Sequence, residues 1–427
     1  MNPRRRWLQF WSLSLLVVGV VPIGPSHPAL AESAAEGRLA VPASVRGVEP
    51  SATAFDAERY QPAVLRLTIT QDQRDNNSIL DLTLIPAKGD LLGRRVTIPT
   101  QELAGQLRDL YRQISRQQPM DVANPTAPAR RLYQVLFEPL AADLDRLAIT
   151  TLLLSADPGL QAIPFAALHD GRNYLGQRFA MALTPSLGLM PLDVPGSSTS
   201  DRRKLAVGAS EFEGLAPLPL VPQEIEQVTT GGSSERYVNR AFTPGLLVQK
   251  AGENSIDRVH VATHAEFLPG GPAQARLYTG SGPMSLKEFA NLRQRRSGAA
   301  PLELLALSAC RTAIGDKDSE LGFAGLALQA GARSAIGTLW YVDDVATSAF
   351  FVQFYRYLDE GLPKAEALQA TRNAMAGGLI HLKGDQMMGP GATPLLRGLT
   401  ASQQRRVATG LQHPFFWAGI TLMGAPW

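Results

Sequence analysis

The first third of the chain carries short runs in which apolar and polar residues alternate. The clearest runs are 64–70, 80–85 and 95–98, and alternation with a period of two is typical of strands buried on one face. Turn-forming residues separate the runs at 75–78 and 88–90. The pattern therefore predicts an antiparallel meander of strands.

Two amphipathic helices and a buried strand are predicted after this meander. Thr100 is expected to cap the first helix, because apolar residues recur at helical spacing directly after it. The second helix covers about residues 128–145 and contains Pro139, which we expect to kink it. A continuous apolar run at 149–155 predicts the strand. The inner face of the first helix comprises Leu103, Leu107, Leu110, Tyr111 and Ile114.

The order of elements changes after residues 193–203, a segment rich in Ser, Pro and Gly that predicts a linker and a domain boundary. Beyond it, apolar runs alternate with helical patterns, which favours a mostly parallel sheet covered by helices. Thr243 and Ser285 have the positions of helix N-caps. The expected strands are 205–209, 259–262, 302–308 and 333–340, and the expected helices lie near 222–228, 244–248, 285–292, 321–330, 344–359 and 363–376. The C-terminal part is read as a long irregular insertion over 377–410 and a final strand over 415–422.

The N-terminus has the form of an export signal. Arg4, Arg5 and Arg6 precede a largely apolar stretch over 7–23, and Ala29-Leu30-Ala31 is a small-x-small cleavage site. We therefore predict a signal peptide over 1–31 and a mature protein in the periplasm or outside the cell. A retained membrane anchor is the alternative reading. Residues 32–60 are Ala-, Ser-, Pro- and Glu-rich without periodicity and are read as a flexible leader.

Composition and charge exclude several classes of protein. The chain has 427 residues, of which 45% are hydrophobic and 19% charged, which is globular composition. The net charge of +3 falls to about zero when the signal and its three arginines are removed, which argues against nucleic-acid binding. No later stretch is long and apolar enough to span a membrane, so we expect no stable membrane association after cleavage. One cysteine and scattered histidines do not form a metal site, and no cofactor is expected.

The only cysteine, Cys310, ends the apolar run that begins near residue 302. His264 lies two residues after the run at 259–262. Sites in open α/β sheets form at the carboxyl ends of strands, so a thiol and an imidazole at two strand ends suggest a Cys/His pair. An exported chain with one cysteine cannot form an internal disulfide, and an idle thiol is exposed to oxidation. The alternative is a buried, inert cysteine that acts as a small hydrophobe. His260 shares the strand of His264 but lies deeper, and we expect it to be a core residue.

The segments around these two residues resemble the CHAT family of caspase-like proteins. Residues 259–267 resemble its histidine motif and residues 305–315 its cysteine motif, with further matches at 321–325, 339–344 and 413–418. The resemblance implies an α/β fold with a caspase-like, mostly parallel sheet covered by helices. It also implies two halves, a smaller pseudo-caspase-like α/β half over 61–198 and a catalytic half over 199–427.

The resemblance also implies a chemistry. Cys310 would be the nucleophile, and His264 would take the thiol proton and return it to the leaving amine. The backbone N–H groups of Cys310 and Ala265 would form the oxyanion hole. Alanine at 265 departs from the glycine usual in the family, which restricts φ at that donor.

An acidic pair follows the strand at 333–340. Residues 340–344 align with a Trp-Asp-Val-Thr-Asp motif of the related separases, whose acidic residue reads a basic side chain before the cut. By that resemblance Asp344, with Asp343 beside it, would line a pocket for substrate Arg or Lys. The alternative is that Asp343 or Asp344 caps the following helix.

The sequence thus predicts an exported cysteine endopeptidase that acts on protein or peptide substrates. The alternative from another class is a catalytically silent caspase-like module that binds partners. Acyl transfer to another acceptor, such as ligation, uses the same pair of residues. The sequence specifies no oligomeric state.

Overall fold

The computed structural model describes residues 61–427 except 73, 185–202, 268–274, 297–299, 310–324, 326–327, 329–330 and 342. The predicted signal peptide, leader and nearly all of the predicted linker lie outside these residues. So do Cys310 and most of the helix expected at 321–330.

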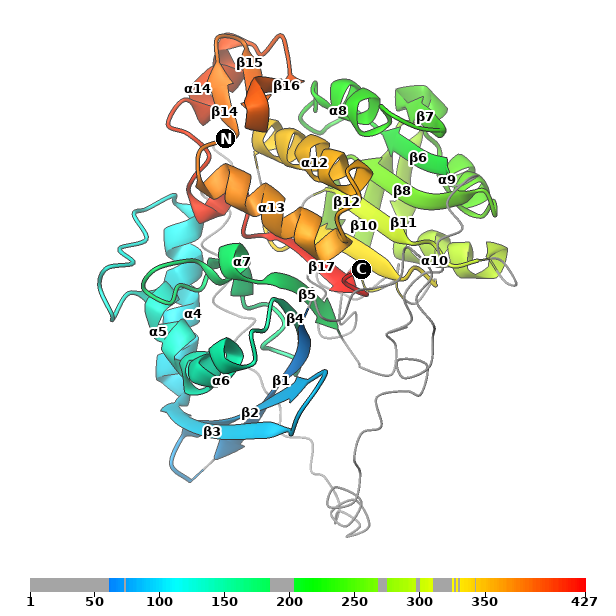
Figure 1. The fold of residues 1–427 in the computed structure, drawn as a ribbon. Coiled ribbons are helices and arrows are strands. Elements are labelled where there is room, and N and C mark those ends of the chain that lie inside the picture. Colours follow the sequence, from blue (N-terminus) through cyan, green and yellow to red (C-terminus); the bar gives the residue numbers. More distant parts are fainter. Residues whose placement is uncertain are drawn as a thin grey trace. The chain divides into compact units, whose positions relative to one another are not determined.

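An eleven-stranded sheet forms the centre of the described structure, in the order β3-β2-β1-β4-β5-β17-β13-β12-β8-β6-β7 (Figure 1). Neighbouring strands are parallel except for the pairs β1–β2, β2–β3 and β13–β17. The strands are β1 Pro62–Asp72, β2 Asn77–Pro86, β3 Leu92–Pro99, β4 Thr151–Ala156, β5 Ala180–Thr184, β6 Arg203–Gly208, β7 Ser234–Val238, β8 Ile256–Ala262, β12 Leu304–Ser308, β13 Ser334–Thr338 and β17 Ile420–Gly424. The predicted α/β class with a mostly parallel sheet is therefore confirmed.

The predicted meander is present as β1, β2 and β3, and it is part of the large sheet because β1 also pairs in parallel with β4. The buried faces of β1 and β2 are formed largely by leucines at alternate positions, as the alternation requires. The strands β12 and β13 are buried along their whole length, as continuous apolar runs predict.

Four helices accompany the first strands: α4 Thr100–Ser115, α5 Pro128–Leu136, α6 Ala141–Arg146 and α7 Leu175–Arg178. Thr100 is not the N-cap that we expected. Pro99 holds the cap position without a side-chain bond, and the Thr100 hydroxyl pairs with that of Ser78 at 2.9 Å. Pro139 does more than kink the second helix, since a short 3-10 turn, η4 Glu138–Leu140, separates α5 from α6 there.

The described helices after β6 include α8 Val221–Val228, α9 Pro244–Ala251, α10 Leu286–Arg295, α12 Asp344–Asp359 and α13 Lys364–Ala376. Both predicted N-caps are confirmed. Thr243 accepts a hydrogen bond from the Leu246 N–H at 3.1 Å, and Ser285 and Glu288 form reciprocal bonds. The helix α12 packs against α8 and α13, and its buried face includes Phe350, Phe351 and Phe354.

Two expectations for the C-terminal part are wrong. Residues 377–410 are not irregular: they form a three-stranded sheet of β14 His381–Lys383, β15 Gln386–Gly389 and β16 Thr393–Leu396, followed by α14 Ala401–Val407. Strands of three or four residues are too short to show a period in the sequence. The final strand begins only at Ile420, because His413 and Pro414 start a short 3-10 turn, η10 Pro414–Phe416, that occupies the first part of the expected run.

A second three-stranded sheet follows β8 and was not expected. It has the order β11-β10-β9 and consists of β9 Ala265–Phe267, β10 Ala275–Thr279 and β11 Gly282–Ser285. It begins at the residue that follows His264. No helix among the described residues combines the length and apolar character needed to cross a membrane.

Candidate active site

Three parallel neighbours, β8, β12 and β13, present their carboxyl ends at one edge of the large sheet. Backbone and side-chain bonds join these ends. The Thr263 N–H donates to the Ser308 carbonyl at 3.2 Å, and the Thr338 hydroxyl donates to the Ala309 carbonyl at 2.8 Å. Cys310 follows Ala309 directly but lies outside the described residues. The structure therefore places His264 and the residue before Cys310 at neighbouring strand ends.

The imidazole of His264 is held from two sides. Its Nε2 lies 2.8 Å from the backbone oxygen of Ala216, and its ring packs on Phe212 with the centroids 4.7 Å apart. A carbonyl oxygen only accepts hydrogen bonds, so Nε2 carries the proton and Nδ1 holds the lone pair of the neutral ring. Nδ1 is therefore the nitrogen available as a base.

The segment that holds the ring connects β6 to α8 and is itself anchored. The Ala209 N–H donates to the Ala262 carbonyl at 3.0 Å, next to the His264 strand end. The Ser210 N–H and hydroxyl both donate to Oδ1 of Asn239, at 2.7 and 3.0 Å. These bonds fix the backbone on which Phe212 and Ala216 stand. Sequence reasoning identified the histidine but not this support, since no local pattern marks it.

Ala265 is the first residue of β9, and its backbone does not need the conformational freedom of a glycine. It lies in an extended strand and does not have a positive φ, so a side chain is tolerated. The Tyr278 N–H donates to the His264 carbonyl at 3.0 Å, and Ala265 lies opposite Leu277. In an antiparallel ladder, the N–H and carbonyl of one residue point to the partner strand and those of the next residue point away. Because the His264 carbonyl bonds to β10, the N–H of Ala265 points away from β10. That donor is therefore on the outer side of β9.

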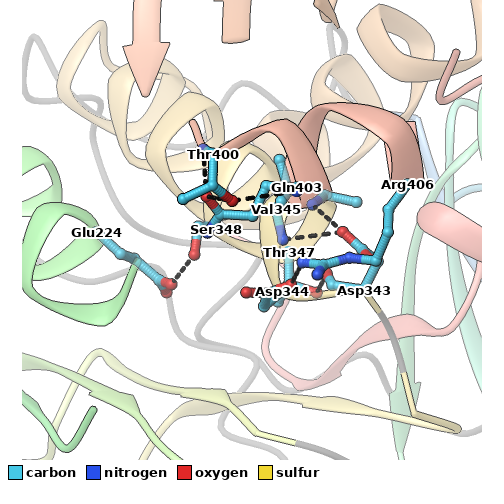
Figure 2. A network of polar contacts seen from close by, with 10 residues as sticks. Glu224, Asp343, Asp344, Val345, Thr347, Ser348, Thr400, Gln403 and Arg406 are labelled. Atoms are coloured by element: carbon cyan, nitrogen blue, oxygen red, sulfur yellow. Dashed lines mark hydrogen bonds and ion pairs between the residues drawn. The ribbon is translucent and has the colours of Figure 1, made fainter. Parts of the chain in front are cut away.

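The two aspartates lie at the start of α12. Asp343 is the N-cap, and its Oδ1 accepts from the N–H groups of Val345 and Ala346 at 2.9 and 3.3 Å. The capping reading is thus confirmed for Asp343, and Asp344 begins the helix. Both carboxylates also pair with Arg406 of α14, as Figure 2 shows. Burial raises the pKa of Asp344, the neighbouring Asp343 adds to the rise, and Arg406 opposes it.

A buried polar network lies beneath this edge. Glu224 of α8 is 1% exposed; one carboxylate oxygen is 2.8 Å from Nε2 of His260 and the other accepts from the Ser348 hydroxyl at 2.6 Å. His260 is 2% exposed and its ring packs on Phe351 and Tyr355, which confirms the expectation of a core histidine. The network joins α8, β8 and α12, and no pattern in the sequence marks Glu224 as part of it.

Other histidines have structural contacts. Nδ1 of His413 accepts from the Phe415 N–H, and burial lowers its pKa. Nδ1 of His169 accepts from the Gly171 N–H. Within the described residues, no group of His, Cys, Asp and Glu has the arrangement of a metal site.

Comparison with known proteins identifies the family. The model of the CHAT domain matches residues 126–425, well over half of the chain. The chain therefore belongs to the CHAT domain family, and its large, mostly parallel sheet flanked by helices is the caspase-like cysteine peptidase fold expected for a member. No protein among the curated ones matches this chain.

Similar solved structures include one separase–securin complex and two structures of gingipain R (RgpB). In the Saccharomyces cerevisiae separase–securin complex, the similar chain is 12% identical, with a TM-score of 0.49 over 86% of this chain and 30% of the other. The Arg-specific cysteine proteinase gingipain R is 11% identical, with a TM-score of 0.43 over 76% of this chain and 75% of the other. The complex of pro- and mature domains of Porphyromonas gingivalis RgpB is 9% identical, with a TM-score of 0.38 and 77% coverage of both chains. This chain thus corresponds to less than a third of the first of these proteins.

Proposed function

We propose that this protein is a cysteine endopeptidase in which Cys310 is the nucleophile and His264 the base. The observation that carries the proposal is the hydrogen bond from His264 Nε2–H to the Ala216 carbonyl. It leaves Nδ1 as the basic nitrogen on a ring that packing on Phe212 holds in place. The strand of His264 and the strand leading to Cys310 are direct neighbours, which supports the pairing.

The proposed reaction has two halves. The Cys310 sulfur attacks the peptide carbonyl carbon while the thiol proton passes to His264 Nδ1. The negative oxygen of the tetrahedral intermediate accepts from the backbone N–H groups of Ala265 and Cys310. The intermediate collapses to an acyl-thioester, and the proton on His264 goes to the leaving amine. Water then attacks the thioester with the same histidine as base, which releases the acid and restores the thiol.

The alternative of a catalytically silent binding module rested on Ala265. Its extended backbone and outward N–H support the active reading instead. The proposal extends to the compartment: a chain with the export signal read in residues 1–31 would act in the periplasm or outside the cell. Asp343 and Asp344 are the acidic groups proposed to lie near the side chain before the cleaved bond, and both pair with Arg406 in the structure.

Covalent labelling tests the proposal. The mature chain is treated with a peptidyl electrophile, and the modified residue is located by mass spectrometry. We expect modification of Cys310, its near-complete loss in His264→Ala, and no effect of His381→Ala, a matched change of an exposed histidine on β14. Cleavage of a peptide library should follow the same order. If Cys310 reacts no faster than a free model thiol and His264→Ala changes nothing, the silent module is the correct reading. Transfer of the acyl group to an added amine in preference to water would indicate a ligase.

A further inference from the structure

Arg406 bridges the two carboxylates at the start of α12. Its Nε donates to Asp343 Oδ2 at 2.7 Å, and its Nη2 donates to Asp344 Oδ1. Figure 2 shows the guanidinium lying across both aspartates. One planar fork thus contacts two acidic groups, which is the geometry that a guanidinium ligand adopts with carboxylates. Arg406 belongs to α14, 62 residues after Asp344 in the chain.

The acidic pair and His264 both follow carboxyl ends of parallel strands, at the same edge of the sheet. The connection from β13 to α12 begins at Thr338, which bonds to the residue before Cys310, and it continues through Tyr341 to Asp343. Tyr341 is 41% exposed, so this connection reaches the surface of the described structure. Tyr278 bonds to the backbone of His264. The connection to the acidic pair and His264 thus both begin at the carboxyl ends of the neighbouring strands β13, β12 and β8.

The side chain of Arg406 can rotate away from the two aspartates while the helix α14 stays in place. Val407 of α14 is 1% exposed, and Thr400 and Gln403 close its first turn with reciprocal hydrogen bonds. The insertion is also attached to α8 by two bonds between Gln223 and the backbone of Arg397. The Arg406 side chain is 42% exposed, whereas the side chains of Asp343 and Asp344 are 11% and 23% exposed. The guanidinium is thus the most exposed of the three groups, so it can turn toward solvent while Asp343 and Asp344 stay in place.

We propose that Arg406 is a specificity-determining residue of the candidate peptidase: it fills the acidic pair and competes there with the basic side chain of a substrate. The inference rests on the proposed function. A substrate arginine must displace an identical group from Asp343 and Asp344, so it gains little over a neutral side chain. Removal of the Arg406 charge leaves the two carboxylates free to bind the substrate guanidinium. The pair then favours arginine before the cleaved bond.

Two matched probes test this inference. They are peptidyl electrophiles that differ only at the residue before the reactive group, one with arginine and one with its neutral isostere citrulline. The measured quantity is the ratio of their rate constants for labelling Cys310 in the mature chain. We expect a ratio near one in the wild type and a rise of about tenfold or more in Arg406→Gln, since the new contact is a charge-assisted bidentate one.

Three further variants show whether the effect comes from the acidic pair. Arg405→Gln removes the preceding exposed arginine of α14 and should leave the ratio unchanged. Asp344→Asn combined with Arg406→Gln should return it to near one. Arg406→Lys keeps a charge but has no planar fork, so an intermediate ratio is expected. Circular dichroism checks the fold of each variant, and Arg406→Lys carries the test if Arg406→Gln does not fold.

The outcomes separate this inference from the proposed function. If the citrulline probe labels Cys310 in every variant but the ratio is the same with and without Arg406, the inference is wrong and the peptidase stands. A ratio that rises equally in Arg405→Gln also overturns it, because the effect is then general charge. If neither probe labels Cys310 in any folded variant, the proposed function fails and the inference with it.

Discussion

The Nε2–H of His264 donates to the backbone carbonyl of Ala216 at 2.8 Å, across 48 residues of sequence. This bond selects the tautomer of the only histidine at the carboxyl ends of β8, β12 and β13 among the described residues. The acceptor belongs to the connection between β6 and α8, which Phe212 also places against the ring. The reactivity of the proposed Cys310–His264 pair therefore depends on a segment that contains neither residue.

Substitution of Phe212 should impair labelling without unfolding the protein. Phe212 is half-buried and packs on the His264 ring at 4.7 Å between centroids. In Phe212→Ala the ring keeps its bond to Ala216 but loses one side of its packing, so its orientation becomes less restricted. We expect the rate constant for Cys310 labelling to fall about tenfold and the unfolding temperature to change little. Phe212→Leu is the control and should retain most of the rate; equal rates in all three proteins would contradict the role given to Phe212.

The carboxylate of Glu224 should be needed for folding. Glu224→Ala leaves buried polar groups of His260 and Ser348 without this partner, at a cost of about 2–4 kcal/mol in the free energy of unfolding. Glu226→Ala, on the exposed side of the same helix, should cost about 0.5 kcal/mol or less. Urea denaturation of both variants measures the difference. Comparable stabilities would show that the buried network contributes nothing.

The backbone N–H of Ala265 should be required for turnover but not for folding. Ala265→Pro removes that N–H, and because the group points away from β10, no ladder bond is lost. We expect peptide hydrolysis to fall by about 10²–10³-fold, the usual effect of losing one oxyanion donor. Ala265→Gly retains the donor and should remain active. Full activity in the proline variant would exclude this N–H from the oxyanion hole.

Lys364 should make stability depend on pH near neutrality. It is 7% exposed, burial lowers its pKa to about 7, and Glu303 opposes the shift. In the unfolded chain its pKa is about 10.4, so between pH 7 and 10 the unfolded state binds more protons and stability rises with pH. Below pH 7 the cost of the buried charge is fully present.

The free energy of unfolding should rise by up to about 1.4 kcal/mol per pH unit because of Lys364. The measurement is the difference in unfolding free energy between the wild type and Lys364→Met, followed as a function of pH. Lys364→Met should also be the more stable protein at pH 7, since it buries no charge. Lys383→Met, an exposed control on β14, should follow the wild type. A pH-independent difference between wild type and Lys364→Met would mean that Lys364 titrates normally.

Local patterns predicted much of the fold. Alternation was sufficient to predict the strands β1 and β2, because burial on one face leaves a period of two in the sequence. Continuous apolar runs were sufficient to predict β8, β12 and β13, which are buried on both faces. The N-caps at Thr243 and Ser285 were also predicted, since a cap depends on residues three positions apart. Thr100 is not the cap, because it is the first residue of α4 and its hydroxyl bonds to that of Ser78 on β2.

The candidate site was only partly predictable. Motifs gave His264 and Cys310 their proposed roles, and those roles remain predictions. The short strands β9, β10 and β11 were missed, although β9 decides which way the Ala265 N–H points. The acidic pair was expected from the sequence, but its partner on α14 was not, because residues 377–410 showed no pattern.

The sequence by itself determined the strands that end shortly before His264 and Cys310 and the buried position of His260, since these follow from neighbours in the chain and from apolar periodicity. It left the helix cap open between Asp343 and Asp344. Only the tertiary structure decided that Ala216 holds the His264 ring, that Glu224 joins His260 to Ser348, and that Arg406 fills the acidic pair. Each of these contacts joins residues at least 36 positions apart. Such contacts depend on how whole elements pack, which no local pattern encodes.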